Sequence, residues 1–160
     1  MDAHHNFREK AAEAFAAFED GEYELAAGLY RALWGEAPGD ATTAFNLGLS
    51  LERLGDDASA LEWFERVVDQ EAGACDAWNE IGLIHFRRND PARAEDAFRR
   101  VLALAPADAL ALNNLGVLHF IRGELREARG FFELALAADP GQEDARVNLS
   151  DTLDMLGEEK

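Results

Sequence analysis

Two histidines, His85 and His119, come closest in this sequence to a pair that could do chemistry, because they stand 34 residues apart in similar surroundings. Imidazole binds transition metals, but a metal site needs further ligands within about 2.0–2.2 Å of the ion. Each histidine instead belongs to a stripe of apolar residues at helical spacing. We therefore predict that both pack in the core, and that His4 and His5 give only incidental metal affinity.

The other reactive side chains lack partners in the sequence. Cys75 lies near a predicted helix start, where a thiol can be activated, but no histidine base can be placed beside it. Ser50, Ser59 and Ser150 have no triad context, and no carboxylate is paired with a nucleophile. A single cysteine excludes an internal disulfide and suits a reducing compartment. The sequence predicts no enzyme, no catalytic residues, no metal and no cofactor.

The elements that must position these side chains follow a 34-residue repeat that runs through nearly the whole chain. A small residue, an alanine, an aromatic residue and a proline recur at this step. They are Gly48, Gly82 and Gly116; Ala26, Ala60, Ala94 and Ala128; Tyr30, Phe64, Phe98 and Phe132; and Pro38, Pro106 and Pro140, with Ala72 in the gap. Such a period indicates one supersecondary unit copied several times, here over residues 7–40, 41–74, 75–108 and 109–142.

The composition favours a single all-α domain over residues 1–160. The chain is 48% hydrophobic, rich in Ala, Leu and Glu and poor in β-branched residues. No apolar run reaches the roughly 18–20 residues that span a bilayer, and the first residues do not read as a secretory signal. We predict a cytoplasmic location and no membrane partner.

The net charge of −17 opposes binding to nucleic acid or anionic membranes, because both require a cationic protein surface. The charge is uneven: the first two repeats carry −5 each, the next two −1 each, and residues 143–160 carry −4. Acidic ends can keep an open-ended helical stack soluble. They can also form an acidic rim that basic partners approach, and the sequence leaves both interpretations open.

Each repeat reads as two helices joined by a tight turn. In the third repeat, Asp90 is predicted to cap the second helix, and Pro91 suits its first position. Pro106 marks the end of that helix, and Asp108 is predicted to cap the next one. The turn requires a positive φ, which Gly tolerates best and Asn next. It is occupied by Gly21, Gly55, Asn89, Gly123 and Gly157.

The recurring small residues have a steric purpose. Gly82 and Ala94 let two helix axes approach closely, where larger side chains would separate them. Phe98 is predicted to fill the space between neighbouring repeats. Trp78 reads as core, and Trp63, on a second helix, is predicted to be partly exposed.

These residues resemble the tetratricopeptide repeat (TPR) family over residues 7–156. In the third repeat the match is carried by Trp78, Ile81, Gly82, Ala94, Phe98 and Pro106, and in the fourth by Leu112, Leu115, Gly116, Ala128, Phe132, Ala135 and Pro140. The resemblance implies an α-solenoid of antiparallel helix pairs, stacked as a right-handed superhelix with a concave inner face. It also implies a protein-interaction module without catalytic activity.

Both ends depart from the repeat pattern. Lys10 and Glu13 replace large apolar residues of the first helix, as expected of an end repeat with one face in water. Residues 143–156 read as a single helix, in which Arg146 and Ser150 replace the large apolar residue and the glycine. We predict that this helix caps the stack, and the alternative is that a longer protein has been cut here.

In the TPR family, the first helix of each pair lines the concave surface, which usually takes an extended or helical peptide. Carried over one position at a time, this implies a peptide-binding groove with rows of asparagine and of apolar residues. The groove residues are Asn46, Leu49, Asn79, Leu83, Phe86, Arg87, Asn113, Asn114, Val117 and Phe120. Asparagine can pair with any peptide backbone, and apolar rows offer pockets for anchor residues. The alternative is that the Leu and Phe rows pack against the next repeat.

The groove therefore predicts a protein or peptide partner, bound by an adaptor or scaffold that we expect to be a monomer. The clamp with which co-chaperones of the family hold a C-terminal carboxylate does not transfer, because the matching positions include Asp76 and Glu80. An alternative function is that of a small acidic cytoplasmic secretion chaperone for a hydrophobic client. Those chaperones carry an N-terminal dimerisation segment, and repeats that begin by residue 7 leave no room for one.

Overall fold

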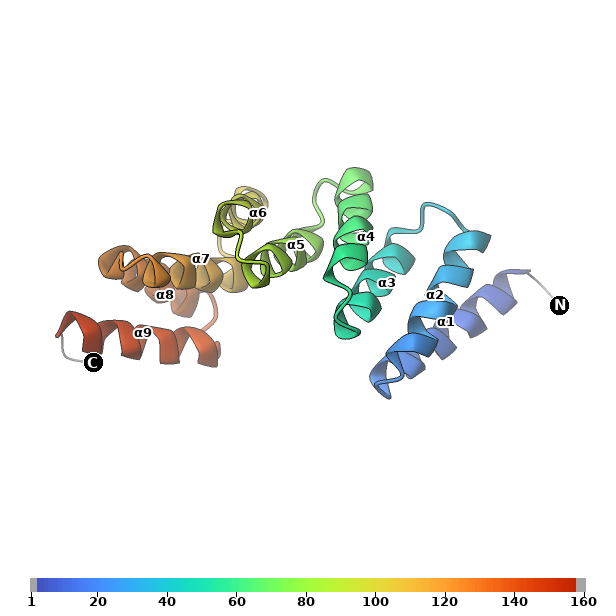
Figure 1. The fold of residues 1–160 in the computed structure, drawn as a ribbon, viewed down its shortest axis with the longest axis horizontal. Helices are drawn as coiled ribbons and strands as arrows, with labels where there is room; N and C mark the ends of the chain where they lie inside the picture. The colour runs from blue at the N-terminus through green and yellow to red at the C-terminus, as the bar shows by residue number, and fades with distance from the viewer. Residues whose placement is uncertain (1–2, 158–160) are drawn as a thin grey trace. The chain divides into compact units, whose positions relative to one another are not determined.

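The computed structural model describes residues 3–157, with side chains from Asn6 onward, and every regular element in this part of the chain is a helix (Figure 1). The helices are α1 (Ala3–Glu19), α2 (Tyr23–Glu36), α3 (Ala41–Arg53), α4 (Asp57–Gln70), α5 (Cys75–Arg87), α6 (Pro91–Leu104), α7 (Ala109–Ile121), α8 (Leu125–Ala138) and α9 (Glu143–Leu156). The prediction of an all-α fold built from helix pairs is confirmed.

The helices form two compact units, Met1–Ala77 and Trp78–Lys160, which we call the N-terminal and C-terminal units. In the N-terminal unit, α2 packs on both α1 and α3, and α3 packs on α4. In the C-terminal unit, α7 packs on α6, α8 and α9, and α8 also packs on α9. Within each unit, these helices therefore pack mainly on their neighbours along the chain, which is the packing of an α-solenoid.

A glycine of the first helix lies against a buried phenylalanine ring of the second helix in three of the repeats. A Cβ atom at Gly82 would lie 2.4 Å from Cε1 of Phe98, closer than such atoms approach in proteins. The corresponding distances are 2.7 Å from Gly48 to Phe64 and 2.5 Å from Gly116 to Phe132. The predicted role of Phe98 between neighbouring repeats did not include its contact with Gly82, the glycine of its own repeat.

The helix starts and turns follow the predicted chemistry. The side chain of Asp90 accepts a hydrogen bond from the backbone N–H of Arg93 at 3.1 Å, and Asp108 accepts one from Ala111 at 2.8 Å. Asn89 has a φ of 58°, in the left-handed region, as predicted for its place in the turn. The four predicted turn glycines also have positive φ, and so does Gly39, which was not predicted.

The first repeat compensates for its polar residues with an ion pair. Lys10, on α1, donates to the carboxylate of Glu36, the last residue of α2. Trp78 holds the corresponding position of the third repeat, where it is half-buried beneath the guanidinium of Arg100, 5.1 Å from its ring centroid. A charged side chain can therefore replace the aromatic one in the first repeat, because a charge on the adjacent helix pairs with it.

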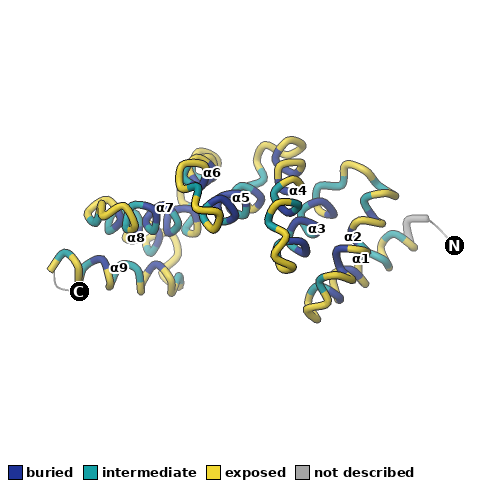
Figure 2. The backbone as a smooth tube through the Cα atoms, viewed as in Figure 1, coloured by how far each residue is buried: buried dark blue, intermediate teal, exposed yellow. Residues whose placement is uncertain are grey.

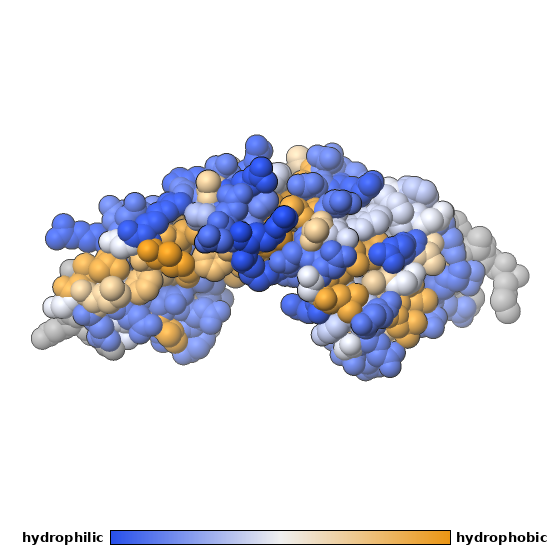
Figure 3. Space-filling view, in the orientation of Figure 1, coloured by the Kyte–Doolittle hydropathy of each residue, from blue (hydrophilic) through white to orange (hydrophobic). Residues whose placement is uncertain are grey.

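Every helix combines a buried face with an exposed one (Figure 2). The largest fully buried side chains include the three repeat phenylalanines and Leu33, Leu47 and Ile84. Some hydrophobic side chains also reach the surface among mainly hydrophilic neighbours (Figure 3). The most exposed large ones are Ile121, Met155 and Phe15, at 64%, 62% and 57%. No helix in the described part of the chain has the length and hydropathy needed to cross a bilayer.

Candidate functional site

A small pocket opens between α5 and α7 in the C-terminal unit and brings together four of the predicted groove residues. Leu83 and Phe86 contribute from α5, and Asn114 and Val117 contribute from α7. The ring of Phe98, held by its contact with Gly82, closes the pocket from α6. The pocket has a volume of about 50 Å³.

The amide of Asn114 is the polar group of this pocket. Its Nδ2 atom is buried and has no hydrogen-bond acceptor among the described residues. A buried polar group without a partner costs about 1–3 kcal/mol. Within the described part of the chain, the fold itself therefore leaves this N–H group without an acceptor.

Two further asparagines of the predicted groove lie inside the unit. Asn79 and Asn113 are only 3% and 5% exposed. Nδ2 of Asn79 makes a long hydrogen bond of 3.5 Å to the carboxylate of Asp108, at the start of α7. Oδ1 of Asn113 accepts a hydrogen bond of 3.0 Å from Nδ2 of Asn148, on α9. These two amides therefore tie α5 to the start of α7 and α7 to α9.

The other predicted groove residues lie elsewhere. Phe120 is half-buried on α7, and Arg87 is exposed at the end of α5. Asn46 and Leu49 are half-buried on α3, in the N-terminal unit, and the backbone carbonyl of Asn46 accepts a hydrogen bond from Ser50. The pocket of the C-terminal unit is thus formed by a subset of the ten predicted residues.

The two repeat histidines are packing residues. His85 is 7% exposed. The ring of His119 stacks on Phe131 at 5.1 Å between centroids, and its Nδ1 lies 2.6 Å from the carboxylate of Glu124. Among the described residues, no three histidine, cysteine, aspartate or glutamate side chains lie together as a metal would require.

One charged cluster joins α6 to the end of α7. The carboxylate of Glu95 lies 2.7 Å from guanidinium nitrogens of both Arg99 and Arg122. Hydrogen bonds from Arg99, and then from Arg122, hold the pKa of Glu95 below its ordinary value, against the opposing effect of burial. This cluster therefore fixes the helix that carries Phe98 to the helix that carries Asn114.

The N-terminal unit holds features that the sequence prediction missed. A pocket of about 230 Å³ lies around Phe45, which is the residue 34 positions before Asn79. That change of residue type between equivalent positions is the signal that could have drawn attention to it. On the second helices, Trp63 packs edge-on against Trp34 at 5.1 Å and is covered by Arg66. It is half-buried, in line with the partial exposure predicted for it.

Comparisons with known proteins agree with this architecture. The Tetratricopeptide repeat family model matches residues 11–74 and 79–143. No curated protein sequence matches the chain. A crystal structure of MamA protein is 21% identical over 94% of this chain and 82% of its own, with a TM-score of 0.80. MamA 41-end from Desulfovibrio magneticus RS-1 is 20% identical over 94% of this chain and 85% of its own, with a TM-score of 0.81. At these identities, the likeness to solved structures concerns the fold.

The family model matches most of the chain. The structure has paired helices, a glycine against a buried ring in three repeats, and positive φ in the turns. The chain therefore belongs to the tetratricopeptide repeat family, whose members are protein-interaction modules.

Proposed function

We propose that the C-terminal unit binds an extended segment of a protein partner, which inserts one apolar side chain between α5 and α7. The chain then acts as a non-catalytic adaptor or scaffold. The observation that carries this proposal is the buried, unpartnered Nδ2 atom of Asn114 at the wall of an otherwise apolar pocket.

The two parts of this pocket suit the two parts of a peptide residue. The carbonyl oxygen of a peptide backbone can accept the hydrogen bond that Asn114 lacks. The apolar side chain of the same peptide residue can displace water from Leu83, Phe86 and Val117. Burial of apolar surface contributes about 25 cal/mol per Å². Because the volume is small, a short aliphatic anchor suits the site better than an aromatic one.

The surroundings of the pocket favour an apolar anchor over a charged one. The third and fourth repeats each carry a net charge of −1, so no strong local field selects a charged ligand. Phe120, further along α7, and Arg87, at the end of α5, extend the proposed site along the two helices. Asn46 and Leu49 belong to the N-terminal unit and form no part of this proposed site.

A selection from a phage-displayed library of random 12-residue peptides tests the proposal. Binding of the selected peptides is then measured by fluorescence anisotropy on two variants. Asn114→Leu removes the N–H donor with little change in size, and we expect affinity to fall about 3- to 10-fold. Val117→Trp fills the pocket, and we expect a loss of about 10-fold or more.

Arg126→Ala, at an exposed position of α8, serves as the matched control and should leave affinity unchanged. Circular dichroism at the wavelength of helix absorption checks that each variant keeps its fold. If the selected peptides bind Val117→Trp as tightly as the unmodified protein, the pocket is not their binding site.

A further inference from the structure

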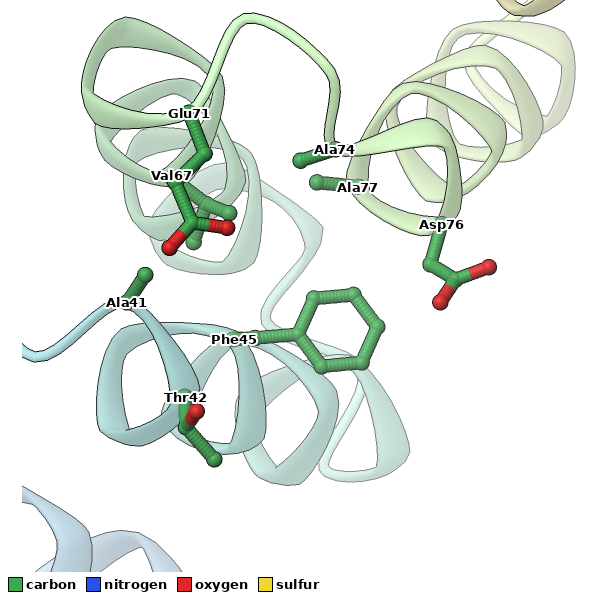
Figure 4. Close-up of a pocket in the computed structure, with 8 residues that line it drawn as sticks. All are labelled: Ala41, Thr42, Phe45, Val67, Glu71, Ala74, Asp76 and Ala77. Carbon is green, nitrogen blue, oxygen red and sulfur yellow. The ribbon is translucent and has the colours of Figure 1, made fainter. Parts of the chain in front are cut away.

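Equivalent positions of the repeats differ at a pocket around Phe45 in the N-terminal unit. The pocket is formed by the start of α3, the end of α4 and the first turn of α5 up to Ala77 (Figure 4). Val67, from α4, is buried at its base, and the half-buried ring of Phe45 forms a wall. Its volume of about 230 Å³ is several times that of the pocket beside Asn114.

Two carboxylates line the same pocket as the Phe45 ring. Glu71 follows the last residue of α4, and Asp76 lies in the first turn of α5 (Figure 4). Both residues are exposed, and neither carboxylate has a hydrogen-bond or ion-pair partner among the side chains and backbone described. A pocket that combines an aromatic ring with two uncompensated carboxylates attracts a cation.

The end of α4 strengthens this preference. The C-terminus of a helix carries a partial negative charge that basic side chains usually offset. The last turn of α4 has no basic residue, and Glu71 adds a further negative charge there. Across the whole N-terminal unit, 17 acidic residues face 5 basic ones. A ligand that brings a positive charge to this pocket therefore relieves repulsion that the chain itself leaves in place.

The corresponding junction of the next repeat lacks these features. Asn79 replaces Phe45 and is buried in its contact with Asp108. Ala105 and Leu110 stand where the two carboxylates stand. The acidic, aromatic pocket thus distinguishes the junction after the second repeat from the junction after the third, and the repeat packing does not require it.

We propose that this pocket binds an arginine side chain from a basic segment of a protein partner. A guanidinium is planar, so it can stack on the Phe45 ring while its N–H groups donate to Glu71 and Asp76. The aliphatic part of the side chain then covers Val67. Lysine carries the same charge but lacks the planar group, so it makes only part of these contacts.

Nuclear magnetic resonance on the ¹⁵N-labelled full chain provides the test. The probes are three blocked tripeptides, acetyl-Ala-X-Ala-amide, in which X is arginine, lysine or the uncharged analogue citrulline. We expect the arginine peptide to give saturable shifts of the backbone amides of Phe45, Ala74, Asp76 and Ala77. The lysine peptide should bind more weakly, and the citrulline peptide should leave these amides unchanged.

Charge-matched variants separate the pocket from general attraction to an acidic surface. Glu71→Gln combined with Asp76→Asn should weaken arginine binding about fivefold or more. Glu62→Gln combined with Glu65→Gln removes the same charge from exposed positions of α4. This control should change the affinity for the arginine peptide by less than about twofold. Phe45→Leu should weaken the arginine peptide more than the lysine peptide.

Three results would overturn the proposal. The two charge-matched double variants could lose the same affinity for the arginine peptide, or the citrulline peptide or the lysine peptide could bind as tightly as the arginine peptide. All the monitored amides and all the substitutions lie in the N-terminal unit. These outcomes are therefore independent of the peptide site proposed in the C-terminal unit.

Discussion

The N-terminal and C-terminal units share one packing scheme but present different surfaces. Gly48 meets Phe64 in the first unit as Gly82 meets Phe98 in the second. The surfaces differ in charge, with 17 acidic and 5 basic residues in one unit and 15 and 10 in the other. They also differ in the pocket that each exposes between helices. The comparison teaches that the 34-residue period specifies the core, while the residues between the repeated positions give each unit its own surface and pocket.

The strongest test of a shared core is to remove its central ring from each unit in turn. Phe64→Ala and Phe98→Ala each delete a fully buried ring and leave a cavity. We expect each to lower the free energy of unfolding by about 3–5 kcal/mol, measured by urea denaturation. Similar losses would support one packing scheme for both units. A loss below about 1 kcal/mol in either unit would show that its ring is not central to the core.

Adding a methyl group opposite the same rings should have a smaller effect. Gly48→Ala and Gly82→Ala improve helix propensity by about 1 kcal/mol, but they force a Cβ atom into a buried ring. We expect a net loss of about 1–2 kcal/mol in each case. Gly28→Ala is the matched control, because no atom lies within 4 Å of its added Cβ, and it should stabilise the protein. Destabilisation by Gly28→Ala equal to that by Gly82→Ala would contradict the steric explanation.

Much of the fold could be predicted from the sequence because its determinants are local. Asp90 and Asp108 are caps by the chemistry of their side chains, and Asn89 adopts positive φ because the turn demands it. The residue that contacts Phe98 could not be predicted, because a recurring aromatic residue indicates burial but does not show which residue it packs against. The contact with Gly82 became evident only from the helix pair.

The site was predicted less completely because neighbouring positions on a helix point in different directions. Successive residues are rotated by about 100°, so Asn113 turns inward to Asn148 while Asn114 faces the pocket. The sequence places Asn113 one position before the row that contains Asn114, but it gives both as groove residues because it does not show what each side chain contacts. The pocket around Phe45 was missed for a related reason, since it depends on the space that side chains from three helices leave between them.

The stabilising effect of the Glu95 cluster in the C-terminal unit should depend on pH. The pKa of Glu95 is lowered by Arg99 and Arg122, so the folded state holds its carboxylate ionised. The contribution of this carboxylate to the free energy of unfolding is fully present above the ordinary pKa of 4.5. It is lost as the pH falls through the lower pKa of the folded state. We expect Glu95→Gln to lower the melting temperature at neutral pH, and this difference to shrink as the pH falls below 4.5.

Glu127→Gln, on an exposed position of α8, is the control for loss of one charge and should show a smaller difference at neutral pH. Melting curves followed by circular dichroism between neutral and acidic pH supply the comparison. A difference between Glu95→Gln and the unmodified protein that does not change with pH would mean that the ionised carboxylate does not stabilise the fold.

The side-chain amide of Asn114 allows the most direct test of the proposed function. Its Nδ2 resonances can be followed by nuclear magnetic resonance while a library-selected peptide is titrated into the protein. We predict a downfield shift of these protons, which saturates with the same dissociation constant as the backbone amides of Leu83 and Val117. Peptide binding that leaves the Asn114 side-chain resonances unchanged would contradict the proposal that this amide holds the partner.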